Sequence, residues 1–238
     1  MYLGDNILKS GVTNLVESFE AGDYGAGIAL QEVDNPKAFG IADVDDESNV
    51  VELIEKPDDP PTSLALIGMY VFSPAVFDAI DDLEPSWRGE LEITDAIQDL
   101  LEDGYEIDSH VVTGWWKDTG KPEDIIHANR LVLEDRELAT SGVIKQGATA
   151  EGRIELANSS IIEDGAVVRG PVSIAESTII KSGTYVGPYT SIGPDSVLED
   201  IHIENSVVIG DSEITASGRI VDSLLGRNAN IDGADEQL

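Results

Sequence analysis

The sequence predicts a mixed α/β domain over residues 1–140, followed by a left-handed parallel β-helix over residues 141–238. Three observations lead to this prediction. Strand and helix patterns alternate in the first part, as in α/β domains. Aliphatic residues recur at every sixth position in the second part, which is typical of a hexapeptide β-helix. A short apolar run at the start ends in Gly-Asp-Asn, which indicates a ligand-binding sheet edge.

The elements of the first part follow from apolar runs and from the residues that end them. We expect strands at residues 26–33, 39–44, 50–54, 64–72 and 107–113, and helices at 12–20, from 74, at 94–102 and at 122–137. Pro74 and Pro122 suit the first turn of a helix, and Gly22 and Gly104 suit helix ends. Thr94 is expected to cap its helix. The uninterrupted apolar run at 64–72 predicts a central strand.

The six-residue period of the second part holds over ten positions. These are Ile144, Ala150, Leu156, Ile162, Val168, Ile174, Ile180, Val186, Ile192 and Leu198. A small residue follows most of them by four places. Six residues supply one strand and its turn, three sides make one coil, and the aliphatic residue points inward. After Leu198 the spacing slips, which predicts either corners or a fraying end. The expected left-handed coil departs from the general crossover rule.

The apolar run before Asp5 predicts a buried strand that delivers this carboxylate to the carboxyl edge of a parallel sheet. A doubly wound domain has several strand–helix units before such a strand. We therefore expect the α/β domain to be N-terminally incomplete in this sequence, with roughly 100 residues of a full domain missing.

The composition excludes several classes of function. There are 47 acidic and 14 basic residues, a net charge of −33, spread along the chain. Phosphate backbones are bound through Lys and Arg, so we expect no nucleic-acid partner. An acidic surface with few lysines indicates adaptation to molar salt, in the cytoplasm of a halophile. The absence of cysteine excludes disulfides and thiolate metal sites. We expect neither a membrane span nor a signal peptide.

Four short motifs occur in order in the first part. They are Leu-Gly-Asp-Asn at 3–6, Glu-Lys-Pro at 55–57, Arg-Gly-Glu-Leu-Glu-Ile-Thr-Asp at 88–95 and Trp-Lys-Asp-Thr-Gly at 116–120. Each alone is common turn or strand-end chemistry. Together they resemble the sugar-nucleotide nucleotidyltransferases, above all the glucose-1-phosphate thymidylyltransferases, over residues 1 to about 130. Archaeal members with a C-terminal hexapeptide β-helix are similar over the whole chain.

The resemblance implies an α/β nucleotidyltransferase with a Rossmann-like mixed sheet. Such enzymes transfer a nucleotidyl group from dTTP to glucose 1-phosphate, giving dTDP-glucose and pyrophosphate, with Mg²⁺. The expected partners are a sugar 1-phosphate and a nucleoside triphosphate. Asp5 and Asp118 match metal-binding aspartates, in keeping with the hard oxygen ligands of Mg²⁺.

The resemblance also assigns roles to other residues. Lys56 and Arg88 match catalytic cations beside the sugar phosphate, where positioning and electrostatics do most of the work. Glu55 matches a carboxylate that accepts hydrogen bonds from sugar hydroxyls. Gly40 matches a glycine whose backbone approaches the sugar, and such an approach needs the absence of a Cβ. Trp116 either walls the sugar pocket or is a core aromatic.

The chain departs from the family in lacking a glycine-rich loop with basic residues, which cradles the triphosphate and reads the base. We therefore expect the 238 residues alone to bind nucleotide poorly and to turn over little. UTP is the alternative nucleotide, because the residues that select the base belong to that loop.

Two other functions stay open for the β-helix. Hexapeptide β-helices occur in acetyl-CoA-dependent acyltransferases, commonly with a histidine base, and His202 is the one histidine of the repeat region. A surface histidine is the simpler interpretation of this residue. The β-helix is otherwise a non-catalytic assembly module whose flat faces pack against copies of themselves in a homo-oligomer.

Overall fold

The computed structural model describes residues 1–137 and 139–233. The chain divides into two compact units, one ending at Asp118 and the other beginning at Thr119. The boundary predicted at residue 140 was placed where the six-residue period begins. The contacts place it earlier, because helix α4 (Pro122–Asp135) belongs to the second unit. Residues 138 and 234–238 of the predicted domains lie outside the described residues.

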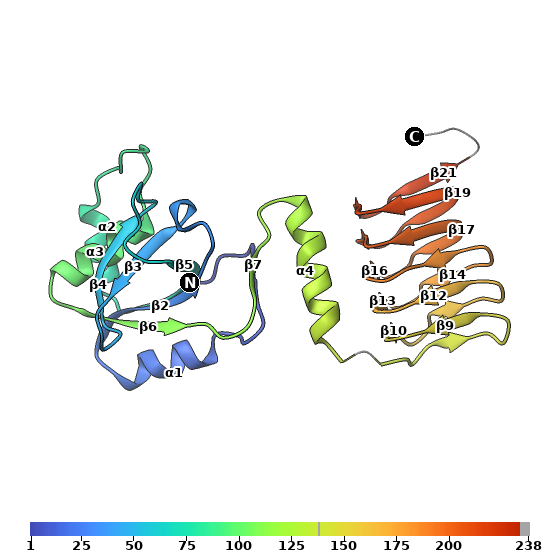
Figure 1. The fold of residues 1–238 in the computed structure, drawn as a ribbon, viewed down its shortest axis with the longest axis horizontal. Helices are drawn as coiled ribbons and strands as arrows, with labels where there is room; N and C mark the ends of the chain where they lie inside the picture. Colours follow the sequence, from blue (N-terminus) through green and yellow to red (C-terminus); the bar gives the residue numbers. More distant parts are fainter. Residues whose placement is uncertain (138, 234–238) are drawn as a thin grey trace. The chain divides into compact units, whose positions relative to one another are not determined.

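The first unit is built on a five-stranded mixed sheet, seen in Figure 1. Its spatial order is β4 (Val50–Glu55), β3 (Gly40–Val44), β5 (Leu64–Phe72), β2 (Tyr24–Glu32) and β6 (Glu106–Val111). Only β2 and β6 pair in parallel, and the other neighbours are antiparallel. The continuous apolar run forms the central strand β5, as predicted.

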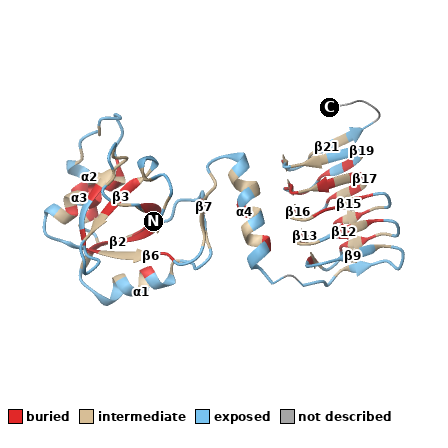
Figure 2. Ribbon diagram, viewed as in Figure 1, coloured by how far each residue is buried: buried red, intermediate tan, exposed pale blue. Residues whose placement is uncertain are grey.

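Helices cover both faces of this sheet because each face carries its own apolar cluster. On one face α3 (Ile93–Glu102) contributes Ile97 and Leu100, and α2 (Val76–Asp82) contributes Val76, to an apolar cluster that includes Ile28 of β2. On the other face α1 (Thr13–Ala21) packs Leu15 against Ile67. A 3-10 turn, η1 (Pro36–Ala38), leads into β3. Figure 2 shows these buried positions concentrated along the central strands.

Two predictions for this unit are wrong. Residues 1–5 form no buried strand: Met1, Tyr2 and Leu3 are exposed, and Tyr2 makes a single antiparallel bridge to Met69. The chain turns at residues 4–5, so strand β1 (Asn6–Leu8) begins after Asp5 instead of ending there. Strand β1 pairs antiparallel with β7 (Trp116–Asp118) in a separate two-stranded sheet.

The second wrong prediction concerns Thr94. The N-cap residue of α3 is Glu92, and Thr94 lies inside the first turn of the helix. Its hydroxyl donates a hydrogen bond to Glu55 rather than to the helix backbone. The cap prediction failed because a threonine hydroxyl at a helix start has a choice of partners, and here a carboxylate from β4 is the partner.

The second unit is a parallel β-solenoid of about five turns, as the six-residue period predicts. One side is the sheet β10 (Ile154–Leu156), β13 (Val172–Ile174), β16 (Thr190–Ile192), β18 (Val207–Val208) and β20 (Leu224–Leu225). The remaining strands form the other two sides: β8 (Val143–Ile144), β9 (Thr149–Glu151), β11 (Ile161–Ile162), β12 (Val167–Arg169), β14 (Ile179–Ile180), β15 (Tyr185–Val186), β17 (Val197–Glu204), β19 (Glu213–Val221) and β21 (Asn230–Gly233).

Equivalent residues stack one coil apart, and the aliphatic position points inward. Ile162 pairs with Ile180, 18 positions later, and both are fully buried. The slip after Leu198 is a corner, the first of the two predicted alternatives. Strand β17 passes through this corner, where Asp200 has a left-handed backbone with φ of 54° and the register shifts between Glu199 and Ile201. The solenoid does not fray there, because pairing continues to β21. The handedness of the coil stays a prediction.

Helix α4 packs along the solenoid through polar contacts. Asn129 accepts a hydrogen bond from Ser191 at 2.6 Å and donates one to the Tyr189 carbonyl at 2.9 Å. The guanidinium of Arg153 donates to the carbonyls of Leu133 and Glu134 in the last turn of α4. Within the described residues, no helix combines the length and the apolarity that crossing a membrane requires.

Candidate active site

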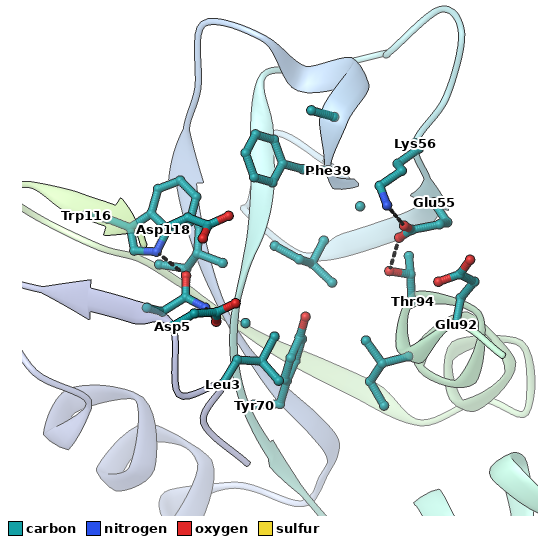
Figure 3. A pocket seen from close by; sticks show the side chains of 17 residues that line it. Leu3, Asp5, Phe39, Glu55, Lys56, Tyr70, Glu92, Thr94, Trp116 and Asp118 are labelled. Carbon is teal, nitrogen blue, oxygen red and sulfur yellow. Dashed lines mark hydrogen bonds and ion pairs between the residues drawn. The ribbon is translucent and has the colours of Figure 1, made fainter. Parts of the chain in front are cut away.

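A cavity of about 210 Å³ opens on the first unit where β3, β4, β5, α3 and the β1–β7 pair converge (Figure 3). Six of the seven residues that the motifs single out are among those that line it: Asp5, Gly40, Glu55, Lys56, Trp116 and Asp118. The seventh, Arg88, does not line the cavity but is joined to it through Glu55. The four motifs are therefore brought to one place from distant parts of the chain.

Glu55, at the end of β4, is the centre of one side of the cavity. Its Oε2 accepts a hydrogen bond from the Thr94 hydroxyl at 2.8 Å. Its Oε1 lies 3.3 Å from Nζ of Lys56 and 3.6 Å from a guanidinium nitrogen of Arg88. The Glu55 side chain is only 13% exposed, so the carboxylate is held among cations and a hydroxyl at the cavity wall. Lys56 itself has a left-handed backbone, with φ of 43°.

Arg88 is fixed by acidic neighbours as well. It lies 3.0 Å from Glu90 and 3.0 Å from Glu92, and Glu92 also accepts a hydrogen bond from Ser86. Burial raises the pKa of Asp95, and the nearby Glu92 and Glu55 carboxylates raise it further. Negative charge thus surrounds the two cations, which keeps them in place and leaves them positioned to meet an anion.

Gly40 permits the close packing of this side of the cavity. A Cβ built on Gly40 would lie 2.5 Å from the Thr94 hydroxyl and 3.0 Å from Oε2 of Glu55. A contact under 3.0 Å requires something to shift. Only glycine therefore fits beside the Thr94–Glu55 hydrogen bond. The close approach of its backbone to a sugar stays a prediction.

The opposite side of the cavity holds the two aspartates. Asp118 ends β7 and pairs in register with Asn6, the residue after Asp5. Asn6 links the group, because it accepts a hydrogen bond from the indole of Trp116 at 2.8 Å and donates one to Asp5 at 2.9 Å. Figure 3 shows Asp5 and Asp118 together beside Trp116.

This pair of carboxylates fits the requirements of Mg²⁺. Mg²⁺ is commonly held by one or two carboxylates, and waters and substrate phosphates supply the other oxygen ligands. Within residues 1–137 and 139–233 no group of three or more His, Asp or Glu side chains forms a closed metal cage. Asp5 and Asp118, the two aspartates expected from the sequence to bind Mg²⁺, both line the cavity.

Trp116 forms part of the cavity wall on the aspartate side. Its ring meets that of Phe39 edge to face, with the centroids 5.6 Å apart. It is partly buried, lines the cavity and also packs against the apolar cluster that contains Leu15 and Ile67, so its position combines the two interpretations offered by the sequence.

Tyr70 and Thr94 are two of the lining residues that the sequence did not assign to the site. Tyr70 reaches the cavity from central strand β5, and its ring stacks on Phe72 with the centroids 5.8 Å apart. Burial, with the Glu55 carboxylate nearby, raises the pKa of Tyr70 to about 12. A tyrosine in an apolar strand gives no signal of its own, whereas Thr94 lay inside a quoted motif and was interpreted only as a cap.

Comparison with known proteins shows the family of the chain. A family model described as nucleotidyl transferase matches residues 1–135. The low-salt glycan biosynthesis nucleotidyltransferase Agl11 of Haloferax volcanii is 76% identical over 238 residues, covering the whole chain and 67% of that protein. The glucose-1-phosphate thymidylyltransferase of Streptomyces antibioticus is 41% identical over 232 residues, covering 97% of this chain and 65% of that protein.

A solved structure gives the same result for the fold. A crystal structure from Bacillus anthracis in complex with sucrose, described as a glucose-1-phosphate thymidylyltransferase, aligns with a TM-score of 0.51 at 37% identity. The alignment covers 58% of this chain and 55% of that one. The chain spans about two thirds of the length of the relatives it matches. With the family model matching more than half of the chain, this protein belongs to the nucleotidyl transferase family.

Proposed function

We propose that this protein acts in nucleotidyl transfer from dTTP to glucose 1-phosphate, giving dTDP-glucose and pyrophosphate. The observation that carries the proposal is the division of the cavity into two sides. Glu55 with its two cations forms one side, and the Asp5–Asp118 pair forms the other. A sugar phosphate is bound by groups that accept hydrogen bonds from its hydroxyls and by cations that face its phosphate. A triphosphate is bound through a metal ion held by carboxylates.

On the first side, Lys56 and Arg88 bind the phosphate of the sugar and neutralise charge as the phosphate oxygen attacks the α-phosphorus in line. Glu55 accepts hydrogen bonds from sugar hydroxyls, with Thr94 fixing the direction of its carboxylate. The backbone of Gly40 lies against the sugar ring, and Trp116 walls the pocket from the aspartate side.

On the second side, Asp5 and Asp118 are the residues that would hold Mg²⁺. When bound there, the ion would supply positive charge against the triphosphate. The protein's own part is to fix the two carboxylates through the β1–β7 pairing and through the hydrogen bonds of Asn6.

The first test measures binding of glucose 1-phosphate to the 238-residue chain by calorimetry. We expect Lys56→Met to weaken binding at least tenfold, since a charge-assisted hydrogen bond contributes about 1.5–3 kcal/mol. Lys145→Met, in the solenoid, is the matched control and should bind like the unchanged chain. Equal binding of glucose 1-phosphate and glucose, or no effect of Lys56→Met, would contradict the assignment of this side.

The choice of nucleotide is the finer part of the proposal. A UTP–glucose-1-phosphate uridylyltransferase of Haloferax volcanii, AglF, is 37% identical over 142 residues, which keeps UTP as the alternative. A turnover assay in which dTTP and UTP compete for the enzyme decides between the two nucleotides. A product pool dominated by UDP-glucose would overturn the thymidylyl assignment.

We also propose that the 238 residues alone turn over slowly, because their sequence contains no glycine-rich loop with basic residues to cradle a triphosphate. Turnover by the isolated chain at the rate of its longer relatives, measured by pyrophosphate release, would show that the triphosphate is bound by other residues.

A further inference from the structure

One side of the solenoid carries an outward row of aliphatic side chains. Val143, Ile161, Ile179 and Val197 occupy equivalent positions on β8, β11, β14 and β17, which pair in parallel and in register. Val143 is 56% exposed and the other three are partly exposed. Because strands alternate their side chains, their neighbours Ile162, Ile180 and Leu198 fill the core, so this row is additional apolar surface. We refer to these four residues as the aliphatic row.

A row of alternating charge runs beside the aliphatic row, two residues further along each strand. It consists of Lys145, Glu163, Lys181 and Glu199. Within the chain Lys145 lies 3.0 Å from Glu163, and Lys181 lies 2.8 Å from Glu199. Both rows end after the fourth coil, where Glu213 follows Val197 in the stack and Thr215 follows Glu199.

The two rows share a symmetry that points to their occupant. Along the solenoid the aliphatic row has the order Val, Ile, Ile, Val, which is unchanged when it is reversed. The charged row has the order plus, minus, plus, minus, so a reversed copy presents the opposite sign at every position. A copy facing this side with its solenoid axis parallel would have its strands reversed, so the two charged rows would lie on opposite sides of the aliphatic rows and form no ion pairs with each other.

We infer that a second copy of this chain packs against this side of the solenoid, with the two solenoid axes antiparallel. The two-fold axis passes between the second and third coils, as a self-complementary isologous contact requires. Val143 then meets the partner's Val197, and Ile161 meets the partner's Ile179. In the charged row Lys145 faces the partner's Glu199, and Glu163 faces the partner's Lys181.

The other two sides of the solenoid differ in the described residues. The side formed by β10, β13, β16, β18 and β20 is contacted by α4, which hydrogen-bonds to Ser191. The third side carries Tyr185, His202 and Arg219 in its outward row, with Arg219 paired to Glu204. The chain has a net charge of −33, so two copies repel each other over most of their surfaces. Of the outward rows described, the aliphatic row offers an uncharged surface at which two copies can meet.

The first test is the mass of the 238-residue chain in molar KCl by sedimentation velocity. We expect the mass of two chains, and the mass of one chain for the double variant Ile161→Asp/Ile179→Asp. Val167→Asp, an outward residue on the third side, is the matched control and should stay a dimer. A single-chain mass for the unchanged protein, or a double variant that folds and keeps the mass of the unchanged protein, overturns the proposal.

The direction of packing is tested by disulfide trapping, which the cysteine-free sequence makes simple. The double variant Val143→Cys/Val197→Cys should give a covalent dimer under oxidation, and neither single variant should. The two positions are three coils apart, about 14 Å at the usual strand spacing, which excludes a bond within one chain. Trapping by Val143→Cys alone would mean parallel packing, and no trapping by the double variant would mean that this side is not the contact; either result overturns the proposal.

Discussion

Glu55 divides its two carboxylate oxygens between different partners. Oε2 accepts from Thr94, and Oε1 faces Lys56 and Arg88. Thr94 is only 2% exposed, so its hydroxyl has little access to water. The carboxylate is thereby held in one orientation before any ligand arrives, which reduces the ordering that ligand binding requires.

Replacement of Thr94 by valine keeps the shape of the side chain and removes the hydroxyl. We expect Thr94→Val to weaken binding of glucose 1-phosphate roughly 10- to 100-fold, because a hydrogen bond to a charged group contributes about 1.5–3 kcal/mol. Thr94→Ser retains the hydroxyl and should retain most of the affinity. Calorimetric titration of both variants checks this, and equal losses in the two would mean that the methyl group, not the hydrogen bond, matters.

Gly40→Ala tests the close packing beside the same hydrogen bond. The added Cβ would lie 2.5 Å from the Thr94 hydroxyl, so the Thr94–Glu55 pair must move. We expect a loss of affinity for glucose 1-phosphate at least as large as in Thr94→Val. Gly4→Ala is the matched control, since nothing lies within 4 Å of its Cβ position. Unchanged affinity in Gly40→Ala would contradict the packing described for this side.

Tyr70 predicts a loss of stability at alkaline pH. Its pKa is raised to about 12, whereas an unfolded tyrosine ionises near its ordinary value of 10.0. Between these values the unfolded chain binds fewer protons than the folded chain, so the free energy of unfolding falls as the pH rises. The loss is about 2–3 kcal/mol across that range. Urea unfolding at pH 9.5 and 11.5, from below the unfolded pKa to just below the folded one, measures most of this loss, and Tyr70→Phe should show a smaller decrease.

At the residue scale, the sequence predicted which residues lie together, and their roles stay predictions. Asp5, Gly40, Glu55, Lys56, Trp116 and Asp118 all line one cavity. Tyr70 could not be found this way, because a tyrosine in a buried strand has the same local pattern whether it packs or binds. Thr94 was found but given the wrong partner, since side-chain hydrogen bonds across distant segments depend on tertiary structure.

At the scale of elements, helix α4 depends on its contacts with the solenoid. The carbonyls in the last turn of a helix have no partner within the helix. Arg153 donates to two of them, those of Leu133 and Glu134, and its positive charge also suits the negative end of the helix dipole. The cation of Arg130 lies 5.5 Å from the centre of the Tyr189 ring, adding a second attachment.

We therefore expect Arg153→Ala to loosen α4 without unfolding the solenoid. The loss should be about 1–3 kcal/mol from the two hydrogen bonds and the dipole interaction. Hydrogen exchange of the α4 amides should become faster, while that of β13 and β16 stays slow. Arg169→Ala, which removes an exposed ion pair with Glu151, is the matched control and should leave α4 unchanged.

The helices and strands were predictable where a repeat period in the sequence, or a proline or glycine that ends an element, defined them. The six-residue period fixed the solenoid because each inward aliphatic residue stacks on its equivalent 18 positions later, as Ile162 does on Ile180. The strand predicted before Asp5 failed for the opposite reason. Three apolar residues fit a buried strand and an exposed bridge equally well, and only the neighbouring strands decide between the two.

At the scale of the whole molecule, the net charge of −33 predicts that stability depends on salt. Charges beyond about 10 Å are screened at 0.1 M salt, and beyond about 3 Å at 1 M, so repulsion across the surface falls steeply in between. We expect the thermal midpoint to rise continuously from 0.1 to 2 M KCl. Differential scanning fluorimetry measures this, and a midpoint unchanged by KCl would show that the acidic surface is not self-repelling.

The coils of the solenoid have nearly the same length, so whole coils can be gained or lost while the stacking is kept. The number of coils is therefore a property on which selection can act. Removing residues 161–178 would delete one 18-residue coil and rejoin equivalent positions, so each remaining coil would still stack on a suitable neighbour. The outward charges would then follow the order Lys145, Lys181, Glu199. In an antiparallel pair of such chains the central Lys181 would face the partner's Lys181, so the charges would no longer be complementary. A solenoid shortened in this way should fold and yet fail to recognise a copy of itself, so the repeat count can specify the partner while the fold tolerates the change.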